Sequence, residues 1–211
     1  KWSGRTCTIV GVNSLVPITH NVMADRIEAG TFCVAATLAK GNLEIKNFDP
    51  EIIRTELELL KKVGAKIKTN DSTIFIKGPN KLRSVKNIKT KEFPGIPTDL
   101  QAQLMVLMCR SIGNSSITES IFENRFMHVA ELQRLGAKII IKNNKAFIEG
   151  NTKFIGAELM SSDLRASVAL VLAALVANGK SIIGRVYHLE RGYENIVNKL
   201  KKIGVKIRRL K

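Results

Sequence analysis

A short sequence that ends one helix and begins a strand occurs three times in this chain, and this repeat limits the possible folds more than any other feature. It reads Lys-Lys-Val-Gly-Ala-Lys-Ile at 61–67, Arg-Leu-Gly-Ala-Lys-Ile at 134–139 and Lys-Lys-Ile-Gly-Val-Lys-Ile at 201–207. The period is about seventy residues, which is long enough for one supersecondary unit. Because glycine takes the left-handed conformation at no steric cost, the motif indicates a helix stop. Its recurrence predicts three similar units around a common axis.

Each unit begins with an acidic residue followed by an apolar helix rich in small residues, which another glycine ends. The acids are Asp25, Asp99 and Asp163, and the helices span about 26–39, 99–111 and 163–177. Because these helices are apolar almost all round, we expect them to be buried. A second helix in each unit has Ile or Leu at helical spacing with charges between, which is typical of a surface helix packed on one face. These second helices span 51–62, 124–135 and 193–202.

Short strands follow the helices, and their partly alternating pattern indicates sheets that cover a core on one side only. Those expected are 43–47, 116–119 and 138–142, and each unit should end in one or two strands. The prediction is an α/β fold with sheets outside and helices within, in one domain over 24–211. Residues 1–23 lie outside the repeat. We read them as a strand at 6–10 and a linker, the tail of a preceding domain that is mostly absent.

Composition excludes several classes of protein. The longest apolar stretch, Val168–Ala177, is about half the length that a membrane crossing needs. Cys7, Cys33 and Cys109 are far apart and form no CxxC motif, so the sequence supports neither a zinc site nor a disulfide framework and fits a reducing cytoplasm. The chain begins with Lys1 rather than Met, and we expect a piece to be missing before it.

The net charge leaves one alternative open. Lys and Arg number 34 against 18 Asp and Glu, which gives a formal net charge of +16. Such a charge is typical of nucleic-acid-binding proteins, but here the basic residues are scattered through core-forming segments rather than gathered in a stripe. We favour composition over a nucleic-acid surface, and a basic cleft for anionic small molecules remains possible.

The segment 94–99 is a turn-prone loop with two prolines that places Thr98 and Asp99 at the start of a buried helix. A carboxylate at that position is usually a cap, worth about 1 kcal/mol. The prolines restrain the backbone more than a cap requires, which favours a positioned acid or base.

Two other segments combine chemically useful residues. In 120–128, Arg125 offers a planar fork for a carboxylate or phosphate, whereas Phe122 and Phe126 have the spacing of core residues and His128 fits a surface or capping position. In the last unit Asp163, Arg165 and Arg191 fall at corresponding ends of neighbouring elements, where we expect the acid between two guanidinium groups. A structural ion-pair network explains that second pattern almost as well.

Five segments together resemble a known family. They are 25–32, 94–103, 119–128, 163–167 and 191–194, which read DRIEAGTF, PGIPTDLQAQ, ESIFENRFMH, DLRAS and RGYE. These strings closely resemble the enolpyruvyl transferases that act on UDP-N-acetylglucosamine, the UDP-N-acetylglucosamine 1-carboxyvinyltransferase family. The resemblance extends over nearly the whole chain, and the segments occur in the family's order.

The resemblance implies two domains, each an inside-out α/β barrel of three repeated units, with the active site between them. The implied reaction moves the enolpyruvyl group of phosphoenolpyruvate to the 3-hydroxyl of UDP-N-acetylglucosamine through a tetrahedral intermediate and releases phosphate, the first committed step of peptidoglycan synthesis. It implies no metal or organic cofactor, no nucleic-acid partner and no membrane partner.

The resemblance also implies roles for individual residues. Asp99 is implied to contact the sugar 3-hydroxyl as general base, and the backbone of Ile121 to touch the nucleotide sugar. The implied phosphoenolpyruvate side comprises Asp163, the second catalytic carboxylate, together with the binding residues Arg125, Arg165 and Arg191.

The same resemblance implies that this chain is the C-terminal half of such an enzyme. The first domain of the family supplies a reactive Cys on a mobile loop, which none of the three cysteines here replaces, and its amino-terminal residues complete the second barrel. We therefore expect an open strand edge and an inactive isolated chain. Two alternatives remain: an enolpyruvyl transferase acting on shikimate 3-phosphate, and a basic nucleic-acid-binding protein.

Overall fold

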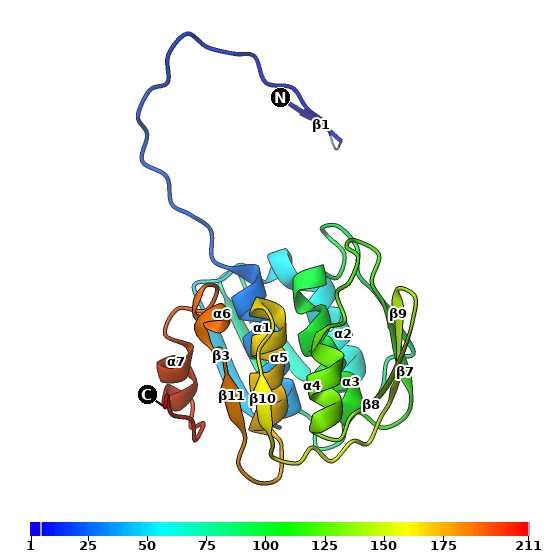
Figure 1. Cartoon of the computed structure of the whole chain (residues 1–211). Coiled ribbons are helices and arrows are strands. Elements are labelled where there is room, and N and C mark those ends of the chain that lie inside the picture. Colours follow the sequence, from blue (N-terminus) through cyan, green and yellow to red (C-terminus); the bar gives the residue numbers. More distant parts are fainter. Residues whose placement is uncertain (5, 211) are drawn as a thin grey trace.

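Three buried helices form the centre of the molecule in the computed structural model, which describes residues 1–4 and 6–210. They are α1 (Arg26–Leu38), α3 (Gln101–Arg110) and α5 (Leu164–Leu175), one from each predicted unit. The predicted burial is confirmed, because all residues of α3 from Gln101 to Cys109 are buried. The helix expected from 99 begins later, since Thr98–Leu100 form a separate 3-10 turn, η2. Figure 1 shows helices in the middle and strands outside, the arrangement expected of an α/β inside-out barrel.

The second helices pack one face on this core. They are α2 (Arg54–Val63, after the 3-10 turn η1, Pro50–Ile53), α4 (His128–Arg134) and, in the last unit, α6 (Tyr187–Glu190) with α7 (Ile196–Lys202). Gly64, Gly136 and Gly204 follow α2, α4 and α7 with φ of 116°, 99° and 92°, which confirms the predicted helix stops. All three begin later than expected: α2 at 54 instead of 51, after η1, α4 at 128 instead of 124, and α7 at 196 instead of 193. Asn124 (φ 54°) and Asn195 (φ 51°) are left-handed and interrupt the helical backbone there.

Units 1 and 2 each have an outer sheet. The first contains β3 (Asn42–Lys46), β4 (Lys66–Asn70) and β5 (Thr73–Lys77) in the order β3-β5-β4. The second contains β6 (Asn87–Lys89), β7 (Ser115–Thr118), β8 (Lys138–Lys142) and β9 (Lys145–Glu149) in the order β6-β7-β9-β8. In both sheets the last strand of the unit lies in the middle and pairs antiparallel with both neighbours, as in the registers Leu43↔Ile76 and Ile67↔Ile76.

The third unit departs from this pattern. Its sheet has two parallel strands, β10 (Glu158–Met160) and β11 (Ile182–Gly184). The strand expected after Gly204 is absent from the described residues 205–210. In units 1 and 2 that strand pairs with its successor in a hairpin, and residues 205–210 have no such partner within the described chain. Val205 and Ile207 instead pack against a small apolar cluster around Tyr193 and Leu200. Among the described residues, β11 pairs only with β10, so its other edge is open, in agreement with the expected open edge.

Residues before α1 lie apart from the barrel. The described part of this segment has a two-stranded hairpin of β1 (Trp2–Ser3) and β2 (Thr6–Cys7), so the strand expected over 6–10 is shorter than predicted. The described residues up to Asp25 are exposed, and Figure 1 shows them running away from the barrel. The domain boundary at 23/24 stays a prediction. Among the described residues, no helix has both the length and the apolar character that a membrane span requires.

Candidate functional site at the amino ends of the inner helices

The amino ends of α1, α3 and α5 meet at one end of the barrel around a small hollow. It has a volume of about 160 Å³, and we call it the helix-end hollow. Its lining residues are Asp25, Ile27, Asp99, Leu164, Arg165, Gly192 and Tyr193. Helix amino ends carry a partial positive charge, which attracts negatively charged groups.

Asp25 and Asp163 cap their helices. Asp25 Oδ1 accepts hydrogen bonds from the backbone N–H of Ile27 (2.7 Å) and Glu28 (3.3 Å). Asp163 Oδ1 accepts in the same way from Arg165 (2.8 Å) and Ala166 (3.0 Å). Both carboxylates therefore satisfy the first amide groups of a buried helix.

Asp99 does not cap, although it opens the corresponding segment of the second unit. η2 and α3 have no side-chain cap hydrogen bond. Asp99 Oδ1 instead accepts from Arg165 Nε and lies 3.5 Å from Nη1 of Arg125. The Asp99 side chain is 40% exposed, against 33% for Arg165 and 18% for Arg125. Asp99 therefore does not act as the usual helix cap. Its role as a positioned acid or base stays a prediction.

The expected placement of Asp163 between two guanidinium groups is wrong. The Arg165 side chain donates to Asp99, whereas Oδ1 of Asp163 accepts from the backbone amides of Arg165 and Ala166. Arg191 is exposed in the turn after α6, and within the described chain it forms no ion pair with Asp163. Its neighbours Gly192 and Tyr193 line the helix-end hollow, so Arg191 lies beside the site.

The loop of residues 120–127, which we call the 120–127 loop, brings Arg125 to within 3.5 Å of Asp99. In the same loop the amide of Ile121 donates to Glu119. The Arg125 guanidinium carbon lies 4.3 Å from the centre of the Phe122 ring, a cation–π distance. Phe122 is 52% exposed, so its assignment to the core is wrong, whereas Phe126 does pack against the core. Phe122 lies in the loop before α4, which begins only at His128.

His128 is buried rather than at the surface as expected. It is 3% exposed at the first position of α4. Burial lowers the pKa of His128 to about 4, and the nearby Asp163 charge opposes this only in part. His128 is buried because it lies on the same face of α4 as Val129 and Leu132, and this face packs on the core.

Sequence reasoning missed two groups of polar residues that support the site. Glu119 is 2% exposed and receives four hydrogen bonds at the root of the 120–127 loop. Thr31 and Tyr193 share a buried hydrogen bond of 2.9 Å, and Gln103 Nε2 donates to Thr31 (3.2 Å) and to the carbonyl of Asp99 (2.9 Å). The only signal was their presence inside the five resembling segments, since polar residues within apolar helices have no distinctive spacing.

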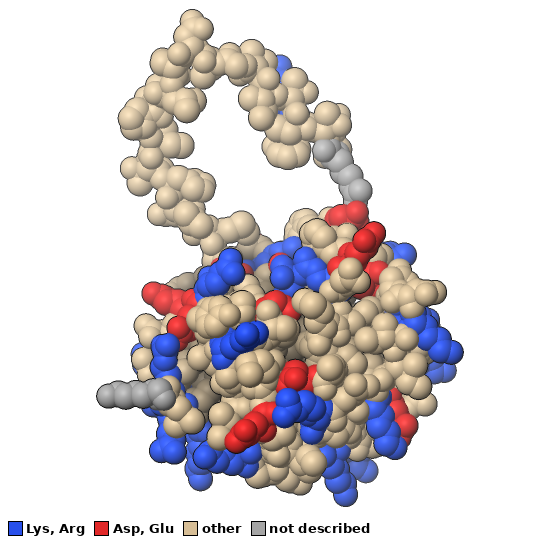
Figure 2. All heavy atoms as spheres, in the orientation of Figure 1, with Lys and Arg blue, Asp and Glu red and all other residues tan. Residues whose placement is uncertain are grey.

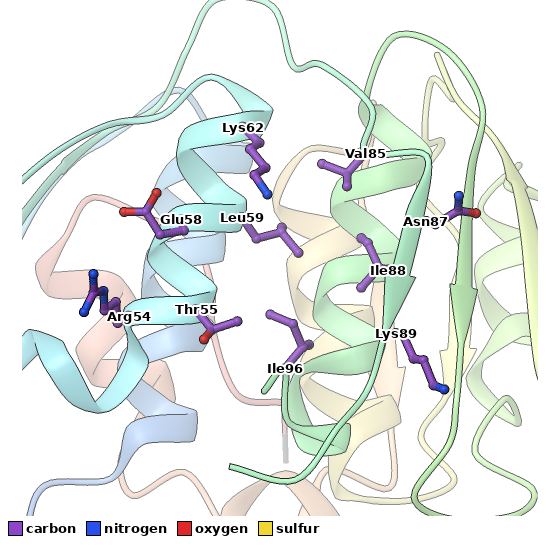
Figure 3. Close-up of a pocket in the computed structure, with 10 residues that line it drawn as sticks. All are labelled: Arg54, Thr55, Glu58, Leu59, Lys62, Val85, Asn87, Ile88, Lys89 and Ile96. Carbon is purple, nitrogen blue, oxygen red and sulfur yellow. The ribbon is translucent and has the colours of Figure 1, made fainter. Parts of the chain in front are cut away.

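A larger hollow of about 320 Å³ lies elsewhere, between α2 and β6 (Figure 3). Leu59, Ile88 and Ile96 point into it, and Arg54, Lys62 and Lys89 lie at its rim. None of the predicted site residues lines it, so it is separate from the helix-end hollow.

The distribution of charge gives no continuous basic stripe on the visible face. Figure 2 shows Lys and Arg side chains spread over several parts of that face with acidic side chains between them. This scatter agrees with the sequence pattern and does not favour a nucleic-acid surface there.

Comparisons with known proteins agree with the fold. Residues 1–200 match the family model described as EPSP synthase (3-phosphoshikimate 1-carboxyvinyltransferase). A UDP-N-acetylglucosamine 1-carboxyvinyltransferase of Pelagibacter ubique is 59% identical over the whole chain, which covers 50% of that protein. One from Desulfosudis oleivorans is 51% identical over 96% of the chain, which covers 48% of that protein.

A solved structure of an enolpyruvyl transferase has a similar fold. The enolpyruvyl transferase NikO from Streptomyces tendae superposes with a TM-score of 0.80 at 29% identity, over 89% of this chain and 44% of that one. The chain therefore spans about half the length of the relatives that it matches. Its inside-out α/β barrel and the family match over residues 1–200 show that this chain belongs to the EPSP synthase family of enolpyruvyl transferases.

Proposed function

We propose that this chain is one half of an enzyme that transfers the enolpyruvyl group of phosphoenolpyruvate to the 3-hydroxyl of UDP-N-acetylglucosamine and releases phosphate. The observation that carries the proposal is the contact of Asp99 with Arg165 and Arg125 at the meeting point of three helix amino ends. Two relatives 59% and 51% identical are named for this sugar nucleotide, which supports it as the acceptor substrate. The description of the matching family names 3-phosphoshikimate, so shikimate 3-phosphate is the alternative acceptor.

Asp99 is proposed as the general base. Both of its guanidinium contacts use Oδ1, and no hydrogen bond to Oδ2 occurs among the described residues. This supports the assignment, because a general base needs an oxygen that can accept the proton of the sugar hydroxyl. The hydroxyl oxygen then bonds to C2 of phosphoenolpyruvate, its proton passes to Asp99, and a general acid supplied by the second half of the enzyme protonates C3. The tetrahedral intermediate returns a C3 proton to the enzyme as the C–O bond to phosphate breaks, which restores the double bond and releases phosphate.

Arg125, Arg165 and Arg191 are proposed to hold the phosphate and carboxylate of phosphoenolpyruvate. Fixed guanidinium groups suit a multiply charged anion because they offer donors in a rigid fork, and the helix amino ends add to the positive potential. We assign Asp163 to the same side of the site as the second carboxylate, where it also caps α5. The backbone of Ile121 is proposed to contact the nucleotide sugar. These residues need no metal for the steps assigned to them.

The reaction is proposed to need a second half, and the 211 residues alone should be inactive. The described cysteines support this: Cys33 and Cys109 are fully buried, and burial raises the pKa of each thiol to about 12, so neither can serve as a reactive thiolate. Cys7 lies in the outlying hairpin. We place the enzyme in the reducing cytoplasm, in peptidoglycan synthesis.

Calorimetric titration tests the proposal. The sample is this chain joined to the N-terminal half of the Pelagibacter ubique relative, called the reconstituted protein below. UDP-N-acetylglucosamine, with and without phosphoenolpyruvate, should bind saturably and more weakly after Asp99→Asn. No binding by a folded reconstituted protein contradicts the proposal, and saturable binding of shikimate 3-phosphate instead supports the alternative. Product formation by the 211-residue chain alone contradicts the need for a second half.

A further inference from the structure

We propose that Glu119 is a positioning residue, which holds Asp99 and the 120–127 loop in the arrangement that receives the sugar nucleotide. The inference rests on the proposed function, since Asp99 and Ile121 are the residues proposed to contact that substrate. Glu119 itself lies beneath the site and is 2% exposed, so it acts through its neighbours.

Four donors converge on the Glu119 carboxylate. Oε1 accepts from Thr90 Oγ1 (2.8 Å) and from the backbone N–H of Ile121 (2.9 Å) and Phe122 (3.3 Å). Oε2 accepts from Thr98 Oγ1 (2.8 Å). An ionised carboxylate only accepts hydrogen bonds, and burying one is costly unless its oxygens are occupied. The four donors occupy both oxygens of Glu119, and the same hydrogen bonds fix the positions of the donors.

One of these hydrogen bonds reaches the segment that carries the proposed base. Thr98 directly precedes Asp99, so its bond to Oε2 fixes the start of η2. Thr90 lies at the base of the same proline-containing segment, where Lys91 N donates to the Ile96 carbonyl (2.8 Å). Both ends of residues 90–98 are therefore tied to one carboxylate.

The other hydrogen bonds reach the opposite side of the site. The two amides fix the first turn of the 120–127 loop, and Thr90 Oγ1 also accepts from Ser120 N (2.9 Å). Phe122, whose amide binds Glu119, supports Arg125 through its ring, and Arg125 lies 3.5 Å from Asp99. Glu119 thus joins the two segments whose side chains meet at the Arg125–Asp99 contact.

The repeat itself does not require a buried acid at this position. Asn47 and Arg185 are the residues that follow β3 and β11, as Glu119 follows β7. Both are exposed with a φ of 57°, whereas Glu119 is buried. Because the other two units fold with exposed residues there, we attribute the buried carboxylate to the site rather than to the barrel.

The test compares Glu119→Gln, Glu119→Met and Glu56→Met in the reconstituted protein. Glutamine can keep accepting from the two amides with Oε1, and its Nε2 can donate to the Thr98 hydroxyl, so it should keep most activity. Methionine has a similar volume and accepts none of these bonds, so kcat/KM should fall by about 100-fold, the loss that a small misplacement of reacting groups causes. Glu56 is an equally buried glutamate (4% exposed) in α2, and Glu56→Met controls for the loss of a buried acid.

Amide hydrogen exchange supplies a readout that does not need substrate. Exchange at Ile121 and Phe122 should be faster in Glu119→Met and unchanged in Glu119→Gln and Glu56→Met. Thr98→Val removes one donor to Oε2 and should lower kcat/KM by itself. Combined with Glu119→Met it should lower kcat/KM less than the product of the two single effects, because both remove one interaction.

Three outcomes overturn the proposal: catalytic efficiency of Glu119→Met equal to that of Glu56→Met, unchanged exchange at Ile121 and Phe122, or an equal loss in Glu119→Gln and Glu119→Met. If Glu119→Met does not fold, the Thr98→Val variant provides the test. An unchanged kcat/KM in Thr98→Val then overturns the positioning role of Glu119. Failure of the proposed function is distinguishable, because then the unsubstituted reconstituted protein binds no UDP-N-acetylglucosamine.

Discussion

Arg165, at the start of α5, donates through Nε to the carboxylate of Asp99, 66 residues earlier in the chain. The contact joins the second and third units at the helix-end hollow, and it leaves Asp163 to cap α5 alone. The repeat places an acid at the start of each inner helix, and these acids have two different roles. Asp25 and Asp163 cap their own helices, whereas Asp99 contacts Arg165 of the neighbouring unit.

Replacing Asp99 by asparagine should remove most turnover from the reconstituted protein without unfolding it. The amide cannot take up a proton, and it loses its charge interaction with Arg165 and Arg125. A reduction of about 100-fold or more in kcat is expected for loss of a general base. The partly exposed ion pair contributes about 1 kcal/mol or less to stability, so the fold should remain.

The matched control for this substitution is Asp49→Asn. Asp49 caps the 3-10 turn η1 through the amide of Glu51 (2.9 Å), and asparagine caps equally well. Steady-state assays and thermal unfolding should show turnover and stability unchanged for Asp49→Asn. Near-normal turnover of Asp99→Asn contradicts the role as general base.

Stability should fall below pH 6.5 because of His128. Burial lowers the pKa of this side chain to about 4 in the folded chain, so the unfolded chain binds the proton more tightly. The contribution of neutral His128 to the free energy of unfolding is fully present above pH 6.5 and is lost progressively as the pH falls toward 4. The loss between pH 8 and pH 5 is about 2 kcal/mol. Urea unfolding of the 211-residue chain at these two pH values measures the difference.

His128→Phe keeps an aromatic ring of similar size and removes the titration. The loss of stability between pH 8 and pH 5 should therefore be smaller in this variant by about 2 kcal/mol. His188→Phe provides the comparison on α6 and should keep the full pH dependence. An identical pH dependence in His128→Phe and the unsubstituted chain contradicts the assignment to His128.

The Tyr193 hydroxyl should contribute measurably to stability. It lies 2.9 Å from Thr31 Oγ1 in a buried network, and burial raises the pKa of Tyr193 to about 12. Tyr193→Phe should lower the free energy of unfolding by about 1 kcal/mol, the usual net value of one such hydrogen bond. Tyr187→Phe, which removes the hydroxyl of a side chain 56% exposed, should change it little. Equal unfolding midpoints in urea for the two variants rule out a stabilising network.

Gly150 should tolerate no side chain. A Cβ atom there would lie 2.1 Å from the carbonyl oxygen of Ser111 and 2.2 Å from that of Gly113, both of them backbone atoms. Gly150→Ala should therefore cost about 3 kcal/mol through displacement of the backbone where β9 meets the end of α3. Gly11→Ala, with nothing within 4 Å, is the control and should leave the thermal midpoint unchanged. A midpoint for Gly150→Ala equal to that of the control contradicts the predicted close approach.

The sequence by itself determined the three units, the order of elements in the first two and the burial of the inner helices. Local rules suffice for these features, because the glycine stops after α2, α4 and α7 and the apolar character of α1, α3 and α5 act within a few residues. The same local rules misplaced the starts of α4 and α7, where Asn124 and Asn195 adopt left-handed backbones that spacing alone does not reveal.

Only the tertiary structure decided which residues meet. The sequence proposed Asp99, Arg125 and Arg165 as candidates but paired Arg165 with Asp163, and it gave no reason to examine Glu119. Whether an acid at a helix start caps or faces a neighbouring unit depends on contacts between segments tens of residues apart. A buried polar residue such as Glu119 is recognisable only once the donors around it are known, because hydrogen bonding, not residue type, offsets the cost of its burial.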